Sequence, residues 1–162
     1  MSQTFYAINQ PAAMAGMLYD LGENDVVSAV NNTQAVPFGV AMVQGTLDNE
    51  CHLPASAGDL AKTLGVSVLV QTKEQALVTS IVNYPVGSDV SILRKGRVWV
   101  QVEEAVVAFS PVFVRFAAGS GTQLGAFRAS ADTATAGQIS GCVYRSSAAA
   151  GGFAVVEFNL PA

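Results

Sequence analysis

One histidine and two cysteines are the residues of this chain best suited to nucleophilic or metal chemistry. A Ser or Cys nucleophile needs a base within hydrogen-bond reach, and the single histidine, His52, follows Cys51 directly. Neighbouring residues of a strand point to opposite faces, so these two side chains would diverge. Cys142 completes no spaced pair of the kind that zinc sites use. We therefore interpret His52 as a partly exposed loop residue, and we expect unbridged thiols and no bound metal.

Two further patterns resemble binding or catalytic motifs. The glycine-rich stretch at 119–125 follows an apolar segment, as a phosphate-binding loop would, but the residues after it favour a short strand and a turn. A phosphate loop needs a helix start at that point. Glu103 and Glu104 are adjacent, so in a strand they point apart and form no acid and base pair. The sequence thus predicts a protein that is not an enzyme and needs no cofactor.

Basic residues gather at one place, the stretch "VSILRKGRVWVQVEE" at 90–104, which holds three of the eight Lys and Arg residues and the single tryptophan. Apolar residues alternate on both sides of "RKGR", which predicts a β-hairpin with Gly96 in its turn. Basic side chains at a hairpin tip would either prevent stray strand pairing, the favoured interpretation, or bind an acidic protein surface. The candidate contact residues of this stretch are Arg94, Lys95, Arg97 and Trp99.

The composition restricts the classes of partner. Hydrophobic residues make up 51% of the chain and charged residues 12%, against about a quarter in typical globular domains, so much of the surface must be uncharged and suited to burial against another protein. The net charge of −4 argues against nucleic acid as a partner. The most apolar region, "AVVAFSPVFVRFAAG", falls short of the ~20 residues of a membrane span. The N-terminus has no basic head and apolar core of a secretory signal, so we expect synthesis in the cytoplasm.

Short strands dominate the second half of the chain. From Val66 onward, apolar runs alternate with Gly, Pro, Ser and Asp clusters every eight to twelve residues. This spacing predicts an all-β (mainly β) fold, a compact β-barrel or sandwich. One short helix is expected in "AGDLAKTLG", with Asp59 as its cap and Gly65 at its end.

The pattern predicts an extended N-terminal arm at 1–30 and a β-rich domain at 31–162, with a possible internal boundary near 84–89, where Pro and Gly interrupt the strands. The arm lacks helical or strand periodicity, yet it contains more large apolar residues than a disordered tail normally does. A partner should therefore order it. Its candidate contact residues are Phe5, Tyr6, Met14, Met17, Leu18 and Tyr19.

Taken in order, the segments "QPAAMAGMLYD", "PFGVAMVQGT", "GVSVLVQT", "YPVGSDVSILRKGRVWVQV" and "GFAVVEFNLP" resemble the structural cement, or capsid decoration, proteins of tailed bacteriophages. The resemblance covers nearly the whole chain as a pattern of segments. It implies a virion protein that binds the outer surface of the phage head as a homotrimer, contacts the major capsid protein and stabilises the shell, with no catalytic residues. The alternatives are a tail-tube or head-tail joining protein and, from another class, a carbohydrate-binding β-sandwich module.

Overall fold

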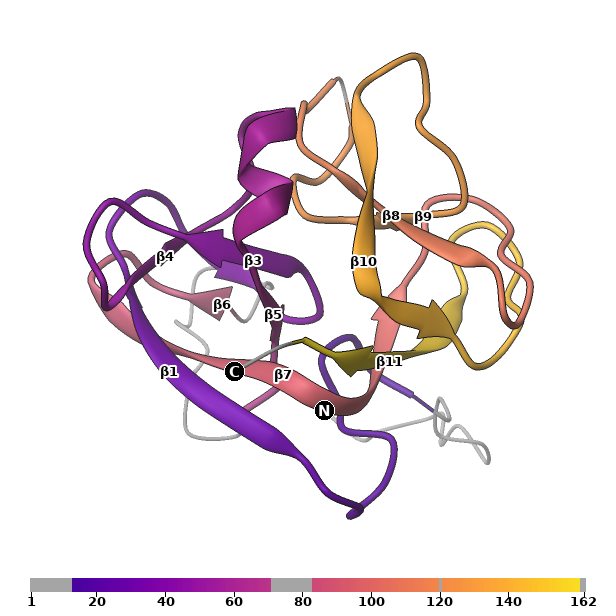
Figure 1. Cartoon of the computed structure of the whole chain (residues 1–162), viewed down its shortest axis with the longest axis horizontal. Coiled ribbons are helices and arrows are strands. Elements are labelled where there is room, and N and C mark those ends of the chain that lie inside the picture. The colour runs from indigo at the N-terminus through magenta and orange to yellow at the C-terminus, as the bar shows by residue number, and fades with distance from the viewer. Residues whose placement is uncertain (1–12, 71–82, 120, 161–162) are drawn as a thin grey trace, which may run out of the picture.

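The computed structural model describes residues 13–70, 83–119 and 121–160. They form a mainly β fold with a barrel-like sheet, which confirms the predicted class (Figure 1). The first part of the chain contains β1 (Asp25–Asn31), β2 (Val36–Pro37), β3 (Ala41–Gln44), β4 (Glu50–His52), the 3-10 helix η1 (Ala57–Lys62), β5 (Thr63–Ser67) and β6 (Asn83–Tyr84). The second part contains β7 (Ser88–Gln101), β8 (Pro111–Arg115), β9 (Phe127–Arg128), β10 (Ala136–Tyr144) and β11 (Phe153–Asn159).

The main sheet has the strand order β1-β4-β3-β5-β7-β11-β10-β8-β9, and β1 also pairs with β7. This additional pairing joins the two ends of the series β1-β4-β3-β5-β7, so these five strands close into a small barrel. Strands β8 to β11 extend from the other end of β7 and occupy the right of the view in Figure 1, with β1, β3 and β4 on the left. Strand β7 is therefore shared by both halves of the molecule.

The predicted hairpin at 90–104 is wrong, because Ser88–Gln101 is one continuous strand. Gly96, expected in a turn, lies within that strand with a φ of 128°, a backbone conformation that favours glycine. A Cβ at this position would collide with the Asn24 side chain. The part of β7 before Gly96 pairs with β1 and β5, and the part around and after it pairs with β11. The alternating apolar residues on both sides of "RKGR" do lie in a strand, but the chain does not reverse its direction between them.

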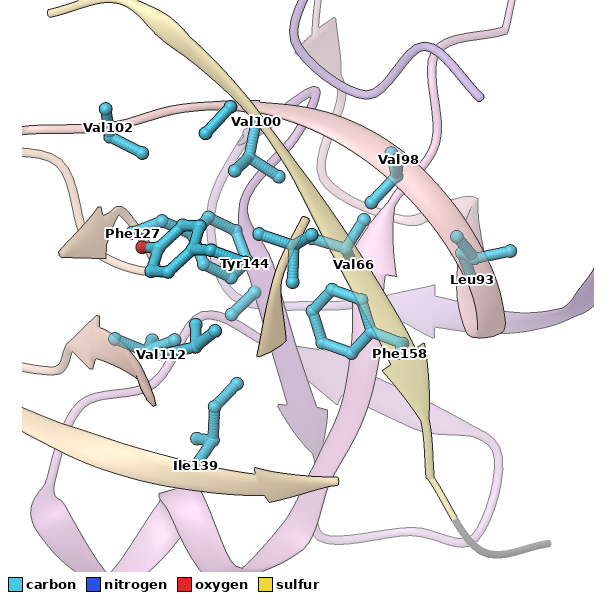
Figure 2. Close-up of a cluster of buried hydrophobic side chains, with 14 of the residues drawn as sticks. Val66, Leu93, Val98, Val100, Val102, Val112, Phe127, Ile139, Tyr144 and Phe158 are labelled. Carbon is cyan, nitrogen blue, oxygen red and sulfur yellow. The ribbon is translucent and has the colours of Figure 1, made fainter. Parts of the chain in front are cut away.

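Two clusters of buried apolar side chains lie on either side of β7. Val90 and Ile92 belong to the first cluster, with residues of β1, β3 and β4, while Leu93, Val98 and Val100 belong to the second. Figure 2 shows Val98 and Val100 on β7 with their side chains in the second cluster. Adjacent strand residues point to opposite faces, so both Ile92 and Leu93 can be buried in this central strand.

The predicted short helix is confirmed as η1, but its N-cap is Ser56, and Asp59 lies in the first turn as the N3 residue of the capping box. The carboxylate of Asp59 accepts hydrogen bonds from the backbone N–H groups of Ala55 and Ser56, each at 2.9 Å. Gly65 does not end the helix, which stops at Lys62; it lies in β5 with a φ of 147°. There the missing side chain lets β5 approach the backbone of Leu93, where a Cβ would clash. Of the apolar runs expected after Val66, the part at 71–82 lies outside the described residues.

A candidate contact surface on the N-terminal segment

The N-terminal segment, residues 13–24, runs along the edge of β7 as an added strand would. The Gly16 N–H donates to the Trp99 carbonyl at 2.8 Å, and the Trp99 N–H donates to the Met17 carbonyl at 2.9 Å. The Tyr19 N–H donates to the Arg97 carbonyl at 2.9 Å. The segment then leads into β1, which pairs with the preceding part of β7. The structure thus brings together two groups of predicted contact residues from distant parts of the sequence.

The basic residues of β7 are paired with acidic residues close to the N-terminal segment. The pairs are Arg94–Asp25 at 3.1 Å, Lys95–Glu23 at 3.0 Å and Arg97–Asp20 at 3.5 Å. The order of the partners reflects the antiparallel course of the two stretches. These three ion pairs, named here the clasp, hold the N-terminal segment against β7. The cluster of basic residues in the sequence is therefore engaged within the chain itself.

Glu157 extends the clasp on the C-terminal side. Its carboxylate accepts hydrogen bonds from Arg97 at 2.6 Å and from Arg145 at 2.7 Å. The hydrogen bonds from Arg145 and Arg97 lower the pKa of Glu157 to about 2. The same carboxylate raises the pKa of Arg97, so both partners stay charged at neutral pH.

Large apolar side chains are exposed on and beside the clasped segment. Leu21 is 98% exposed at the bend before β1, and Met14, Tyr19 and Val26 are 53%, 48% and 43% exposed. The Tyr19 ring lies 5.6 Å from the ring of Trp99, which fixes its orientation. We name Met14, Tyr19, Leu21 and Val26 the contact surface. Exposed apolar side chains concentrated on one segment are typical of a protein interaction site.

The other predicted contact residues differ in their positions. Met17 and Leu18 are half-buried, and Leu18 packs against the second core cluster beside Val98. Trp99 is half-buried on the face of β7 opposite Val98 and Val100. Phe5 and Tyr6 lie outside the described residues. The contact role of all these residues, and the division of the chain into 1–30 and 31–162, stay predictions.

Cys51 and His52 lie in β4 and not in a loop, which corrects the interpretation of His52. The His52 Nδ1 lies 2.7 Å from the Leu53 carbonyl oxygen, and the Cys51 thiol points to Ala29 O at 3.5 Å. Burial raises the pKa of Cys51 to about 11 and that of Cys142 to about 12, so neither carries a reactive thiolate at neutral pH. Both cysteines lie in the described part of the chain and are free thiols there.

Sequence reasoning missed a cluster of five charged residues between β7, β8 and β9, named here the ion cluster: Glu103, Glu104, Arg115, Arg128 and Asp132. The Arg115 side chain is only 4% exposed and binds Glu103 at 2.7 Å and Asp132 at 2.6 Å. Glu103 and Glu104 lie in a bend after β7 and not in a strand as predicted, and both carboxylates reach Arg128, at 2.6 and 3.3 Å. The signal was present in "VFVRF" and "GAFRA", where an arginine interrupts an apolar strand and needs a buried partner.

The ion cluster holds a loop of unusual backbone conformation. Asp132, Thr133 and Ala134 have φ values of 44°, 53° and 66°, which non-glycine residues rarely adopt in succession. Arg115 binds both ends of this loop, through the Asp132 carboxylate and through the Thr135 hydroxyl at 2.9 Å. These contacts connect the loop to Arg115 of β8.

Searches of the described residues for two other kinds of site gave no candidate. No group of three or more His, Cys, Asp or Glu side chains within 13–70, 83–119 and 121–160 is placed to hold a metal ion. In the same ranges, the structure has no helix with the length and hydropathy to cross a membrane. The glycine-rich stretch after β8 leads into β9, so it lacks the helix start that a phosphate loop requires.

In the described residues, a barrel-like sheet carries an exposed apolar segment that is hydrogen-bonded to its edge, an arrangement suited to contact with another protein. A sequence model described as "Structural cement protein (E217 gp24/Pam3 gp6)" matches residues 1–159. The chain therefore belongs to the structural cement protein family of phages, and it is a component of the virion capsid. The comparison with curated proteins found no match.

A solved structure titled "The capsid of Myoviridae Phage XM1" contains a chain with the same fold. The two chains align with a TM-score of 0.77 and 15% sequence identity, over 97% of this chain and 98% of the other. The resemblance predicted from the order of segments is thereby confirmed at the level of family and fold.

Proposed function

We propose that this cement protein binds the outer surface of the phage head as a homotrimer and stabilises the shell by contacting the major capsid protein. The observation that carries the proposal is the contact surface: four exposed apolar side chains on a segment that hydrogen bonds and ion pairs fix against β7. A surface that is already ordered loses little conformational entropy on binding. Neither nucleic acid nor a membrane is among the proposed partners.

The expected binding mode combines apolar burial with strand addition. Among the described residues, β1 pairs with β7 along its length, but β4 takes the other edge only at Val30 and Asn31. The edge at 25–29 is therefore available for an extended capsid segment. Val26 is exposed on this edge and Leu21 lies at the bend before it, so one segment of the partner could reach both.

The proposed trimer is supported by the composition. Only 12% of the residues are charged, and small uncharged residues must cover much of the surface. Such a surface is partly buried in most stable assemblies. Light scattering on a size-exclusion column tests this part, with a mass of three chains expected and a monodisperse single chain as the contradicting result.

Capsid binding is tested by adding variants back to phage particles stripped of this protein and counting bound copies by gel densitometry. Leu21→Ser should weaken binding about tenfold or more, because full burial of a leucine side chain is worth about 1.5–3 kcal/mol. Leu47→Ser is the matched control, because Leu47 is 59% exposed but lies in the loop between β3 and β4. Equal binding of the Leu21 variant and the wild type would contradict the proposed site.

A further inference from the structure

The chain before β1 contains more residues than its course along β7 requires. Leu18 lies opposite Val98, and Asp25 lies opposite Lys95. The stretch from Leu18 to Asp25 is therefore much longer than the part of β7 that it faces. The excess loops out at residues 20–24, named here the bulge. Figure 1 shows this part of the chain at the bottom of the view, beyond the edge of the sheet.

The bulge carries Leu21, the most exposed residue of the contact surface. A surface cavity of about 430 Å³ lies between the bulge and β11, and its lining includes Gly22 of the bulge and Phe158 of β11. Neither the leucine side chain nor the side of the bulge that faces β11 is thus closely packed. The conformation of the bulge must depend mainly on polar contacts.

Asn24 makes polar contacts that fix the bulge from within. Its Nδ2 donates to the Asp20 carbonyl at 3.2 Å and to the Gly22 carbonyl at 3.1 Å. The Gly22 N–H in turn donates to Oδ1 of Asp20 at 3.1 Å. Asparagine side chains commonly hold turns by such bonds to nearby backbone groups. Asn24 therefore ties together the backbone on both sides of Leu21.

Gly96 provides the place on β7 against which the Asn24 side chain lies. A Cβ on Gly96 would collide with the amide oxygen of Asn24, so the missing side chain makes room for this contact. The same oxygen is buried. The ion pairs of Lys95 and Arg97 with the bulge lie on either side of Gly96, but both are exposed and weakened by salt. Asn24 is thus the neutral, partly buried link between the bulge and the strand.

We propose that Asn24 is a positioning residue for the capsid contact, which holds the bulge over Gly96 so that Leu21 is presented to the major capsid protein in one orientation. This inference rests on the capsid contact of the proposed function and adds a residue that acts through Leu21. A loop that is fixed before binding loses less conformational entropy when it binds. Asn24 therefore controls the affinity for the capsid.

A double-mutant cycle in the add-back assay tests this coupling. It compares the wild type, Asn24→Ala, Leu21→Ser and the double variant. Asn24→Ala should weaken binding about fivefold, through lost preorganisation, with an unchanged melting temperature. In the Leu21→Ser background it should cause no further loss, because the side chain that it positions is gone. Asn32→Ala is the matched control, since Asn32 is exposed beyond the other end of β1, donates to Glu50 at 2.8 Å and should be replaceable without loss.

Two outcomes of the cycle overturn the inference. One is wild-type binding by Asn24→Ala, and the other is an equal loss from Asn24→Ala with and without Leu21. In either case a weakened Leu21→Ser variant leaves the proposed function intact. If Leu21→Ser binds like the wild type, the proposed capsid site is refuted, and the capsid role of Asn24 falls with it.

The conformation of the bulge is tested without the capsid by ¹⁵N relaxation of the unbound protein. The amide order parameters of Leu21 and Gly22 should lie near the roughly 0.85 of rigid backbone in the wild type and in Asn32→Ala. They should fall to about 0.6 or below in Asn24→Ala, because the bonds that close the bulge are lost. Equal order parameters in the wild type and Asn24→Ala would overturn the positioning role even if the cycle showed coupling.

Discussion

The clasp and the ion cluster use the same residue types in opposite surroundings. In the clasp, the side chains of Arg94, Lys95 and Arg97 are 25%, 43% and 44% exposed, and their partners are exposed as well. In the ion cluster, Arg115 and Arg128 are 4% and 11% exposed. Exposed pairs are screened by water and contribute about 1 kcal/mol or less, whereas a buried charge that loses its partner is strongly destabilising.

This difference assigns different tasks to the two regions. The ion cluster joins β8, β9 and the loop before β10 to the end of β7, so it belongs to the folding unit around the second core cluster. The clasp attaches a segment at the edge of the barrel, where loss of the ion pairs leaves both core clusters intact. The surface proposed to contact the capsid is thus held by the weak, exposed ion pairs of the clasp. The β-strands that carry it are stabilised by the stronger, buried pairs of the ion cluster.

Removal of Arg115 should have the largest effect on stability. Arg115→Met leaves Glu103 and Asp132 without their main partner and frees the strained loop 132–134, so the free energy of unfolding should fall by about 3–5 kcal/mol. Urea denaturation measures the change. Arg94→Met is the matched variant from the clasp and should cost about 1 kcal/mol or less. Equal losses for the two variants would remove the distinction between the regions.

Gly65→Ala should have the next largest effect, because it disturbs the closure of the barrel. The new Cβ would collide with the Leu93 backbone, and the φ of 147° is itself strained for alanine. Strain of this kind costs about 1–3 kcal/mol before the strands move apart. Thermal unfolding compares this variant with Gly87→Ala, where φ is 79° but an added Cβ meets no atom within 4 Å. If both variants melt alike, the close approach of β5 and β7 is not needed for stability.

The ion cluster should also make stability depend on acid. Burial opposes ionisation of Glu103, but hydrogen bonds from Arg115 and Arg128 outweigh it and lower the pKa of this carboxyl. The pKa of Asp132 is lowered by its hydrogen bond with Arg115. Folded pKa values below the unfolded ones, near 4, mean that this stabilisation is present above about pH 4 and is lost as the pH falls further.

Urea midpoints measured from pH 6 to pH 3 should therefore fall for the wild-type protein and fall less steeply for Arg115→Met, which has already lost the interaction. The half-buried Glu157, with its pKa of about 2, contributes to the loss of stability in acid in both proteins, so the difference between the two curves isolates the ion cluster. Parallel curves would show that Arg115 does not control the titration.

The smallest effect on stability is expected for the clasp. Replacing Arg94, Lys95 and Arg97 with Ser removes the three ion pairs of the clasp and the Arg97–Glu157 pair, and each such surface pair is worth about 1 kcal/mol or less. The difference from the wild type should shrink at high salt, because salt screens such pairs. Fluorescence of Trp99, the single tryptophan, reports detachment of Tyr19, whose ring is tilted against it. A loss of stability as large as that of Arg115→Met would contradict the peripheral role of the clasp.

Much of the fold was predictable because its strands alternate and end at Gly and Pro. The short strands after Val66 and the helix η1 lie in the parts of the chain that the sequence patterns indicated. The interpretation of β7 failed at Gly96, since a glycine between charged residues indicates a turn locally, and only the pairing of β7 with β1 and β11 shows a bent strand. No local pattern encodes which distant strands will flank a segment.

The candidate site was predictable in its residues but not in its arrangement. The apolar residues near the N-terminus and the basic residues at 94–97 were both visible in the sequence. Their direct contact was not, because it depends on the antiparallel course of residues 16–31 along β7. The acidic partners Asp20, Glu23 and Asp25 show the match only once that register is known.

A reconstruction of the phage particle that carries this protein would show directly which surface meets the shell. We expect three copies around each attachment point on the outside of the head, with Leu21 and Val26 in contact with a major capsid subunit. A reconstruction in which the contact surface faces solvent and another face of the barrel meets the shell would contradict this expectation.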